Sequence, residues 1–397
     1  MMNSIPSLTQ WVESKRWFPK RLAGQVPTVQ VLDHSDHWWL VELDYEGACL
    51  QVPLAEGKEA LFNGQLVKDG CADPNFLKAW LQKVAKSGGL FPSQPELVDE
   101  AYTDWMQALG GAKVLTGEQS NTSVLVPARR WPVIIKFFRV LYGGEQPEVS
   151  LPLALTKAGF EGVPQVRAIS QITRNNEVIT DSVASDYVHR AEDGFVFFTQ
   201  AAKAGDSLSK EAFELGRISA QMHSLLERHF GSTLKDIDAS NRLRASYERA
   251  AAAYPPITQI NLPIADLPKL SAPVCRVHGD FHLGQTLHSA TGWSIIDFEG
   301  EPLRPLSERL EPDMPERDIA GMLRSFDYAR ATGGASQQWE QIHRKAFLEG
   351  YSSVRQFHQE ALQILEIDKA LYEVAYEAQH RPTWVHVPLG GLKRLLG

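Results

Sequence analysis

The stretch from residue 278 to residue 302 decides the fold. It reads His278-Gly279-Asp280-Phe281-His282-Leu283-Gly284-Gln285 and, twelve residues after Gln285, Asp297-Phe298-Glu299-Gly300-Glu301-Pro302. A carboxylate is thus followed five residues later by an amide. The apolar run around 293–296 predicts a buried strand that ends at a second carboxylate, Asp297. We therefore expect a polar loop and a strand end to form one site.

These side chains suit phosphoryl transfer to an alcohol. That reaction needs a base for the hydroxyl proton, Mg²⁺ to bridge the phosphates, a cation for the α- and β-phosphates and small groups over the nucleotide. Asp280 is the candidate base. Gln285 and Asp297 supply the oxygen ligands that Mg²⁺ prefers. The sequence thus predicts ATP and Mg²⁺ as cofactors.

The nucleotide-binding candidates lie earlier in the chain. Lys136 falls in the strand-like run 132–138, where a lone cation can reach phosphates. Backbone N–H groups and hydroxyls over the phosphates are expected from Gln119, Ser120 and Ser123. Taken singly, an Asp beside Gly is more often a turn residue and a strand lysine more often a surface charge. The ordered set of lysine, loop and strand-end carboxylate favours the phosphotransferase interpretation.

Length, charge and cysteine spacing exclude several other classes. A chain of 397 residues is long for one core, so two or three domains are expected. The net charge of -8 argues against a nucleic-acid partner. The three cysteines are far apart, which predicts reduced thiols instead of a disulfide framework or zinc site. With no apolar run of membrane-spanning length and no secretory leader, we expect a cytoplasmic protein that does not contact a membrane.

Hydrophobic patterning divides the chain into a sheet-rich part and a helical part. We expect an N-terminal α+β cap domain over 1–90, a lobe with an antiparallel sheet and a helix over 91–203, and a helical lobe over 204–397. Strands are expected at 28–32, 37–44, 48–54, 112–116, 123–127, 132–139, 163–169 and 194–200, and helices at 8–15, 74–86, 147–158, 244–252, 338–351 and 364–379. Polar loops between a sheet lobe and a helical lobe are where ligand chemistry is expected.

The segment 278–285 resembles the HGDxHxxN/Q loop of aminoglycoside- and choline-kinase-like phosphotransferases. A finer resemblance, to bacterial maltokinases, rests on Arg16-Trp17-Phe18 and on the segments 118–123, 278–285, 297–302, 317–328 and 372–384. It implies an α+β, bilobal, eukaryotic-kinase-like (aminoglycoside phosphotransferase-like) fold with an N-terminal cap. It also implies ATP-dependent phosphorylation of maltose to maltose 1-phosphate. The expected setting is glycogen biosynthesis, as a monomer alongside trehalose- and maltose-metabolising enzymes.

The resemblance also assigns roles to individual residues. It makes Asp280 the base, Gln285 and Asp297 the magnesium ligands and Lys136 the phosphate-binding cation. Ser150 stands where the family's glutamate partner of the strand lysine is expected, and Glu148, two residues earlier, is the candidate replacement.

The sequence leaves several classes of acceptor molecule open. Related glucosamine kinases share the architecture, so glucosamine, giving glucosamine 6-phosphate, is the alternative to maltose. An aminoglycoside-type acceptor is also open, because acidic residues at 299, 301, 318 and 377 would suit a cation. A non-catalytic pseudokinase is the minor alternative, which the intact Asp280, Gln285 and Asp297 argue against.

We predict that the sugar-binding residues lie in the helical lobe. They are His282, Asp318, Tyr376, Glu377, Arg381 and Trp384. Aromatic rings stack on sugar faces, while carboxylates and guanidinium groups hydrogen-bond to hydroxyls. The alternative for the last four is core packing with a surface ion pair, and for Asp318 an internal salt bridge to Arg324.

Overall fold

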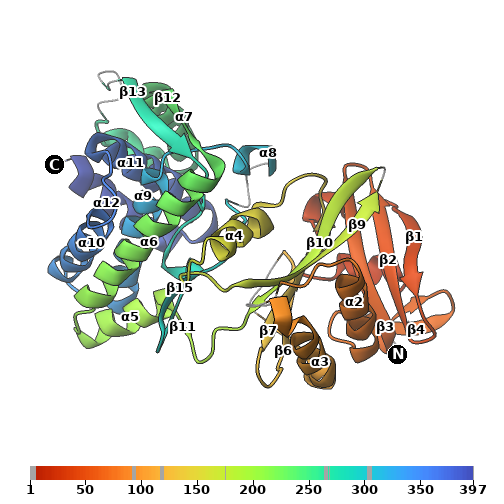
Figure 1. Cartoon of the computed structure of the whole chain (residues 1–397). Helices are drawn as coiled ribbons and strands as arrows, with labels where there is room; N and C mark the ends of the chain where they lie inside the picture. The colour runs from red at the N-terminus through yellow and green to blue at the C-terminus, as the bar shows by residue number, and fades with distance from the viewer. Residues whose placement is uncertain are drawn as a thin grey trace. The chain divides into compact units, whose positions relative to one another are not determined.

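A computed structural model describes residues 6–91, 95–116, 120–174, 176–262, 267, 269–301 and 306–396 (Figure 1). The chain divides into two compact units. The first, here called the sheet unit, comprises Met1–Val149 and Pro164–Tyr187; the second, the helical unit, comprises Ser150–Val163 and Val188–Gly397. The sheet unit contains the whole expected cap and much of the expected following lobe. A further division at residue 90 stays a prediction.

The first sheet of the sheet unit is an antiparallel meander. Its strands are β1 (Thr28–His34), β2 (Trp38–Tyr45), β3 (Ala48–Phe62) and β4 (Gln65–Asp69), in the order β1-β2-β3-β4, and β8 (Val140–Leu141) also pairs with β3. Gly47, at φ +81°, makes the turn between β2 and β3, a conformation that favours glycine. One face of this sheet is buried against α1 (Leu8–Glu13) and the aromatic residues after it, which include Trp17 and Phe18.

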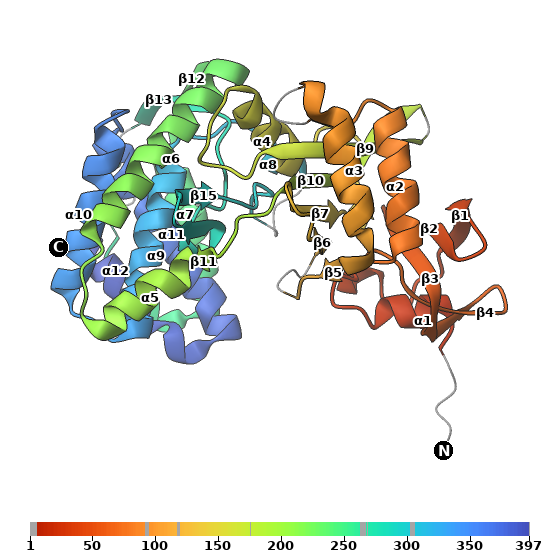
Figure 2. The same cartoon turned by 60° about the horizontal axis from the view of Figure 1, so that its bottom comes forward.

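The second sheet carries the expected nucleotide-binding strands. It has the order β5-β6-β7-β10-β9, formed by β5 (Lys113–Val114), β6 (Thr122–Val126), β7 (Val133–Phe137), β10 (Glu177–Asp186) and β9 (Val166–Arg174). Two helices, α2 (Pro74–Lys86) and α3 (Val98–Ala108), lie side by side against it (Figure 2). Trp80 of α2 donates its indole N–H to Ser182 Oγ at 2.8 Å, which fixes the helix on the sheet. The short helices of this unit are η1 (Lys20–Leu22), η2 (Pro95–Leu97) and η3 (Leu109–Gly111).

The helical unit is built on long helices that share one core. These are α5 (Gly194–Ala204), α6 (Ser209–Phe230), α7 (Ala239–Ala253), α9 (Glu316–Gly333), α10 (Gln337–Ser352), α11 (Gln359–His380) and α12 (His386–Leu396), while α4 (Pro147–Lys157) crosses the division between the units. An apolar stripe of α6, with residues spaced three and four apart, is buried at Leu215, Ile218 and Met222. The crossing of α6 and α10 requires glycine, because a Cβ on Gly216 would lie 2.0 Å from Phe347 O.

Short strands and turns place the polar loops of the helical unit. β11 (Glu192–Asp193), β14 (Thr286–Ser289) and β15 (Gly292–Ile295) form one sheet, and β12 (Ser232–Asp238) pairs with β13 (Lys269–Cys275). The remaining short helices are α8 (Leu306–Arg309), η4 (Pro255–Gln259), η5 (Leu283–Gln285) and η6 (Pro382–Trp384). Among the described helices, none combines the length and apolar character needed to cross a bilayer.

The strand predicted at 194–200 is wrong, because these residues form α5. Asp193 caps the helix by accepting the Val196 N–H at 3.0 Å. The buried residues Phe198, Ala201 and Ala202 follow helical spacing. The aromatic and β-branched content of the run favoured a strand, but the cap and the tertiary packing override that propensity.

Candidate active site

The backbone of the loop that carries Asp280 is hydrogen-bonded to a buried carboxylate. Asp318, in the first turn of α9, accepts the backbone N–H groups of His278 at 2.8 Å and Gly279 at 2.9 Å. His223 Nε2 lies 2.9 Å from the same carboxylate, and its Nδ1 lies 2.9 Å from the Tyr351 hydroxyl. Burial raises the pKa of Asp318, but these hydrogen bonds and neighbouring histidines outweigh it and lower the pKa overall.

Asp318 is therefore a correction to the predicted sugar-binding set. Its side chain is 1% exposed and its oxygens accept bonds from the loop, so it anchors the loop and does not face a ligand. It also makes no salt bridge to Arg324, which instead pairs with Asp327 and Glu373.

A histidine joins this loop to the strand end before Asp297. His278 Nε2 lies 2.9 Å from Ile296 O, and because a carbonyl only accepts, Nε2 carries the proton. The ring also contacts Phe281 and Phe298 at centroid distances of 5.2 and 4.6 Å. These contacts hold the two polar segments of the sequence together.

The two predicted magnesium ligands are adjacent. Gln285 Nε2 donates to Asp297 Oδ2 at 3.0 Å, and the Ile296 N–H donates to Gln285 O at 3.0 Å. Asp297 sits at φ +62°, in the left-handed region that aspartate tolerates better than most residues. The backbone conformation after β15 thus turns its carboxylate toward the amide.

This pair fits the needs of Mg²⁺ in a kinase. Mg²⁺ is usually bound through one or two carboxylates, with substrate phosphates and water completing its shell. Across the described parts of the chain, no group of three or more His, Cys, Asp or Glu side chains could hold a metal. One carboxylate and one amide oxygen suit an ion that arrives with its nucleotide.

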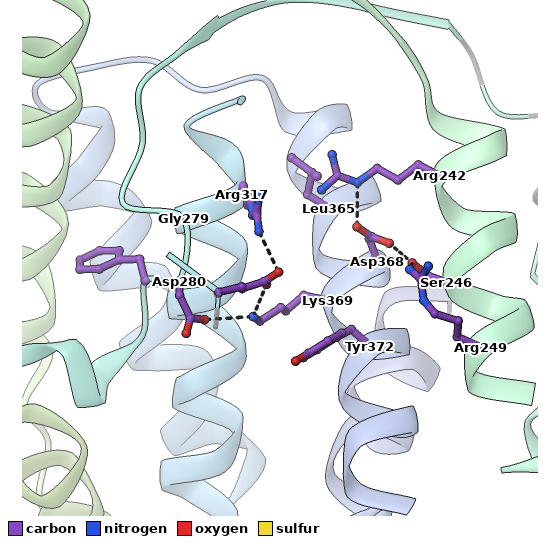
Figure 3. Close-up of a pocket in the computed structure, with 13 residues that line it drawn as sticks. Arg242, Ser246, Arg249, Gly279, Asp280, Arg317, Leu365, Asp368, Lys369 and Tyr372 are labelled. Atoms are coloured by element: carbon purple, nitrogen blue, oxygen red, sulfur yellow. Dashed lines mark hydrogen bonds and ion pairs between the residues drawn. The ribbon is translucent and has the colours of Figure 1, made fainter. Parts of the chain in front are cut away.

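The predicted base contacts a lysine from a distant helix. Lys369 of α11 places Nζ 3.4 Å from Asp280 Oδ1 and 3.0 Å from Glu301 Oε1 (Figure 3). Arg317 of α9 binds the other Glu301 oxygen at 2.9 Å. Burial lowers the pKa of Lys369, but the charges of Asp280 and Glu301 more than offset it and raise the pKa. Lys369 therefore remains a cation that holds the base carboxylate.

Asp280 lies in the wall of a polar pocket of about 480 Å³, its open mouth included. The pocket is bounded by the loop, α7, α9 and α11 (Figure 3). Its lining residues are Arg242, Ser246, Arg249, Gly279, Asp280, Phe281, Glu301, Arg317, Gly321, Leu365, Asp368, Lys369 and Tyr372. Arg242 of α7 pairs with Asp368 of α11 at 2.7 Å, so ion pairs tie the helices around the pocket.

The other predicted sugar residues form a separate cluster at the end of α11 and in η6. Glu377 is 1% exposed and accepts from the Tyr328 hydroxyl at 3.0 Å and from Arg381. Trp384 stacks on Tyr328 with parallel rings 6.5 Å apart. Tyr376 is half exposed and stacks on Tyr372 at 6.5 Å, so it connects this cluster to the pocket. None of the four lines the pocket at Asp280.

His282 lies two residues after Asp280 and caps η5. Its backbone carbonyl accepts the Gln285 N–H at 2.9 Å. Burial is the main effect on its side chain and lowers its pKa below the ordinary 6.5, which favours the neutral ring. A neutral imidazole in this position can donate or accept a hydrogen bond without adding charge.

Several pocket residues were missed by sequence reasoning. Lys369 and Tyr372 are spaced three residues apart on a helix that was predicted, so they lie on one face. The signal was a single lysine within a largely apolar helix stripe. Arg242 had no comparable signal, and Arg317 was noted only as the first residue of the segment 317–328. The place of both at the pocket depends on how three helices pack.

The nucleotide-binding candidates lie in the sheet unit. Lys136 in β7 pairs with Glu148 in α4 at 2.9 Å, with both side chains close to 10% exposed (10% and 12%). The buried Ser150 Oγ makes no hydrogen bond within the described chain, so Glu148 and not Ser150 holds the lysine. Ser123 lies opposite Lys136 in the β6–β7 ladder, and Ser120 is exposed. Gln119 lies outside the described residues.

Comparison with known proteins identifies the relatives. The chain is 25% identical over 338 residues to a glucosamine kinase of Streptacidiphilus jiangxiensis, covering 73% of this chain and 76% of that protein. It is 25% identical over 327 residues to a glucosamine kinase of Mycolicibacterium smegmatis, covering 73% and 81%. A solved glucosamine kinase with glucosamine, ADP and inorganic phosphate superposes with a TM-score of 0.70 at 19% identity, over 99% of this chain and all of that one.

The likeness confirms the predicted α+β, bilobal, kinase-like fold. A second crystal form of glucosamine kinase gives a TM-score of 0.71 at 20% identity over 98% of this chain. The sequence profile of the phosphotransferase enzyme family matches residues 112–357, well over half of the chain and including both Lys136 and the loop of Asp280. The chain therefore belongs to the phosphotransferase enzyme family.

Proposed function

We propose that this phosphotransferase is a sugar kinase that transfers the γ-phosphate of ATP to a sugar hydroxyl in the pocket beside Asp280. The observation that carries the proposal is the position of Asp280, in the wall of a polar pocket and on the same short loop as Gln285, whose amide is hydrogen-bonded to Asp297. A hydroxyl in this pocket is within reach of the base, and the Gln285 amide, one of the two candidate Mg²⁺ ligands, lies five residues along the loop. Acceptor and phosphate can therefore meet at one carboxylate.

Each side chain then has a defined task. Asp280 accepts the proton of the acceptor hydroxyl, and Lys369 keeps its carboxylate oriented. Gln285 and Asp297 would hold Mg²⁺, which neutralises phosphate charge when bound. Lys136, held by Glu148, binds the α- and β-phosphates.

We propose glucosamine as the acceptor. The two relatives compared above are glucosamine kinases, and each alignment spans about three quarters of the two proteins. The carboxylates of Asp280, Glu301 and Asp368 line the pocket and can attract an ammonium group. Glucosamine would then bind with its amine toward this acidic side and one hydroxyl at Asp280.

A specific observation favours a second candidate, the neutral disaccharide maltose. The pocket carboxylates already face cations: Asp280 and Glu301 contact Lys369, and Asp368 contacts Arg242. Four cationic side chains line the pocket against three carboxylates, which weakens its attraction for an ammonium group. The stacked rings of Tyr372 and Tyr376 extend an aromatic surface toward Trp384, where a second sugar ring could stack.

An acceptor panel tests both candidates. Purified protein with MgATP is offered glucosamine, glucose, maltose and kanamycin, ADP release is followed by a coupled assay, and the product is identified by ³¹P NMR. We expect the highest kcat/KM for glucosamine. A higher value for maltose would replace the acceptor, equal values for glucose and glucosamine would show that the amine is not recognised, and no ADP release with any sugar would refute the sugar-kinase proposal.

A further inference from the structure

Arg139 is a fully buried cation that follows β7 in the sheet unit. Its side chain is 0% exposed. The guanidinium pairs with Asp69, donates Nε–H to Thr122 Oγ1 at 2.9 Å and lies 4.4 Å from the ring centroid of Trp17. A buried charge is costly unless it is paired and hydrogen-bonded. The surroundings of Arg139 are therefore built to hold one cation in one position.

The partners of Arg139 come from separate parts of the sheet unit. Trp17 follows the first helix, Asp69 ends β4 of the first sheet, and Thr122 begins β6 of the second sheet. The backbone of Arg139 joins the same parts: its N–H donates to Asn121 Oδ1 at 3.2 Å, and its carbonyl accepts from the backbone N–H of residue 51 in β3 at 2.9 Å. Arg139 thus connects the N-terminal segment and both sheets.

Arg16, the residue before Trp17, makes a second contact between the N-terminal segment and the second sheet. Arg16 donates from its guanidinium to the backbone carbonyl of Thr116, one hundred residues away in the chain. Thr116 lies just after β5, whereas Asn121 and Thr122 lie at the start of β6. Adjacent residues of the N-terminal segment therefore fix both ends of the β5–β6 connection, Arg16 directly and Trp17 through Arg139.

These contacts lie next to the nucleotide-binding candidates. Thr122 is adjacent to Ser123, which sits opposite Lys136 in the β6–β7 ladder. Arg139 follows Lys136 by three residues. A shift of Arg139 or of either end of the connection would move the groups that are expected to meet the phosphates.

We propose that Arg16, Trp17 and Arg139 are positioning residues for the nucleotide, so that the N-terminal segment takes part in ATP binding. The inference rests on the proposed nucleotide site at Lys136 and deepens it. Phosphoryl transfer depends mainly on positioning, and misplacement of about 1 Å costs about 100-fold in rate. The planar guanidinium suits this task, because it makes several hydrogen bonds in one fixed geometry.

The test measures nucleotide binding without any acceptor. The Kd of a fluorescent ADP analogue is measured by titration in the presence of Mg²⁺, for the wild-type full chain and for the Arg16→Met variant. Arg16 is exposed, so this variant should keep its melting temperature. We expect its Kd to rise about fivefold to tenfold, the scale of one hydrogen bond to a charged group at a partly exposed site. Arg21→Met is the matched control, because Arg21 is an exposed arginine five residues further along.

The other end of the connection is tested with the ion pair between Arg139 and Asp69 left in place. Arg139→Met would leave Asp69 without its partner and could unfold the sheet unit, so Thr122→Val, which removes only the hydroxyl acceptor, is used. We expect a rise in Kd of similar size, with the acceptor KM unchanged.

The Lys136→Met variant distinguishes failure of the proposed nucleotide site from failure of the proposed positioning role. If Lys136→Met leaves the Kd unchanged, the nucleotide site itself is misplaced. If Lys136→Met weakens binding while Arg16→Met and Thr122→Val bind like the wild type, the positioning role is overturned and the nucleotide site stands. A lower melting temperature with an unchanged Kd would likewise overturn it, since the contacts would then serve stability alone.

Discussion

Replacing Lys369 by methionine removes a cation that contacts the proposed base. The Lys369 Nζ lies 3.4 Å from Asp280 Oδ1, and the two side chains are each 21% exposed. At that separation two unit charges interact by about 5 kcal/mol at an effective dielectric constant of about 20, an upper bound. Desolvation and the loose distance reduce this to the range of a charged hydrogen bond, about 1.5–3 kcal/mol. We therefore expect kcat to fall roughly 10- to 100-fold.

The effect should be confined to the acceptor step. Lys369→Met leaves Glu301 with its Arg317 partner. Asp280 loses its ion pair, but its side chain is 21% exposed, so the fold should persist. ADP release at saturating ATP is measured together with the KM for ATP, which should be unchanged. Lys369→Arg, which keeps the charge, should recover part of kcat. Lys345→Met is the control, because Lys345 is 77% exposed on α10 and pairs only loosely, at 3.7 Å, with Glu349.

Two results would refute this reasoning. A Lys369→Met enzyme with kcat within twofold of wild type would show that the ammonium does not orient the base. Equal losses in Lys369→Met and Lys369→Arg, accompanied by a lower melting temperature, would assign Lys369 to packing alone.

Four further predictions concern the base, the metal, the loop anchor and the lysine partner. Asp280→Asn should fold normally and lose about 10²- to 10⁴-fold in kcat, and near-wild-type turnover would disprove the base assignment. Asp297→Ala should abolish turnover, and full wild-type activity in excess EDTA would contradict the metal role. The pKa of Asp318 is lowered in the folded state, so its stabilisation is present above the unfolded pKa of about 3.9 and is lost as pH falls through the folded value. Below pH 4 the free energy of unfolding should therefore fall less steeply with pH in Asp318→Asn than in the wild type. Equal pH dependence in the two proteins would contradict this. Glu148→Ala should raise the KM for ATP several-fold while Ser150→Ala changes little, and the reverse ranking would show that Glu148 does not hold Lys136.

The catalytic loop could be predicted from the sequence because its contacts are local. Gln285 and Asp297 lie on one short hairpin, and twelve residues of chain suffice to bring them together. The spacing of Asp280 and Gln285 likewise needs only a single loop. Lys136 and Glu148 are also twelve residues apart, on a strand and the helix that follows it. Such pairs are constrained by chain connectivity before any tertiary packing is known.

The acceptor pocket could not be predicted in the same way. Lys369 meets Asp280 across 89 residues of chain, and Arg242 meets Asp368 across 126. Both meetings depend on the packing of α7, α9 and α11 against one another. Charged residues on predicted helices are usually assigned to solvent, and only the packed core shows which of them face inward.

Asp318 and Arg317 show that a sequence motif can mark residues near a site without predicting what each residue does there. They are consecutive in α9, yet Asp318 is buried beneath the loop while Arg317 lines the pocket and binds Glu301. Successive helix residues point about 100° apart, so the rotation of α9 about its axis decides which one can meet a ligand. The resemblance placed Asp318 in the right lobe, and the helix rotation gave it a different task.

The groups proposed for phosphoryl transfer and the groups that line the acceptor pocket come from different elements of the helical unit. The proposed base and the proposed metal ligands lie on the loop and hairpin 278–297, whereas most of the charged pocket wall comes from α7, α9 and α11. Substitutions on the pocket faces of those helices can change the acceptor while the phosphoryl-transfer groups stay in place. The proposed catalytic loop is therefore compatible with different sugar acceptors. We propose that the balance of cations and carboxylates on α7, α9 and α11 determines the acceptor. Lys369 links the two sets of groups, because it lines the pocket and contacts Asp280.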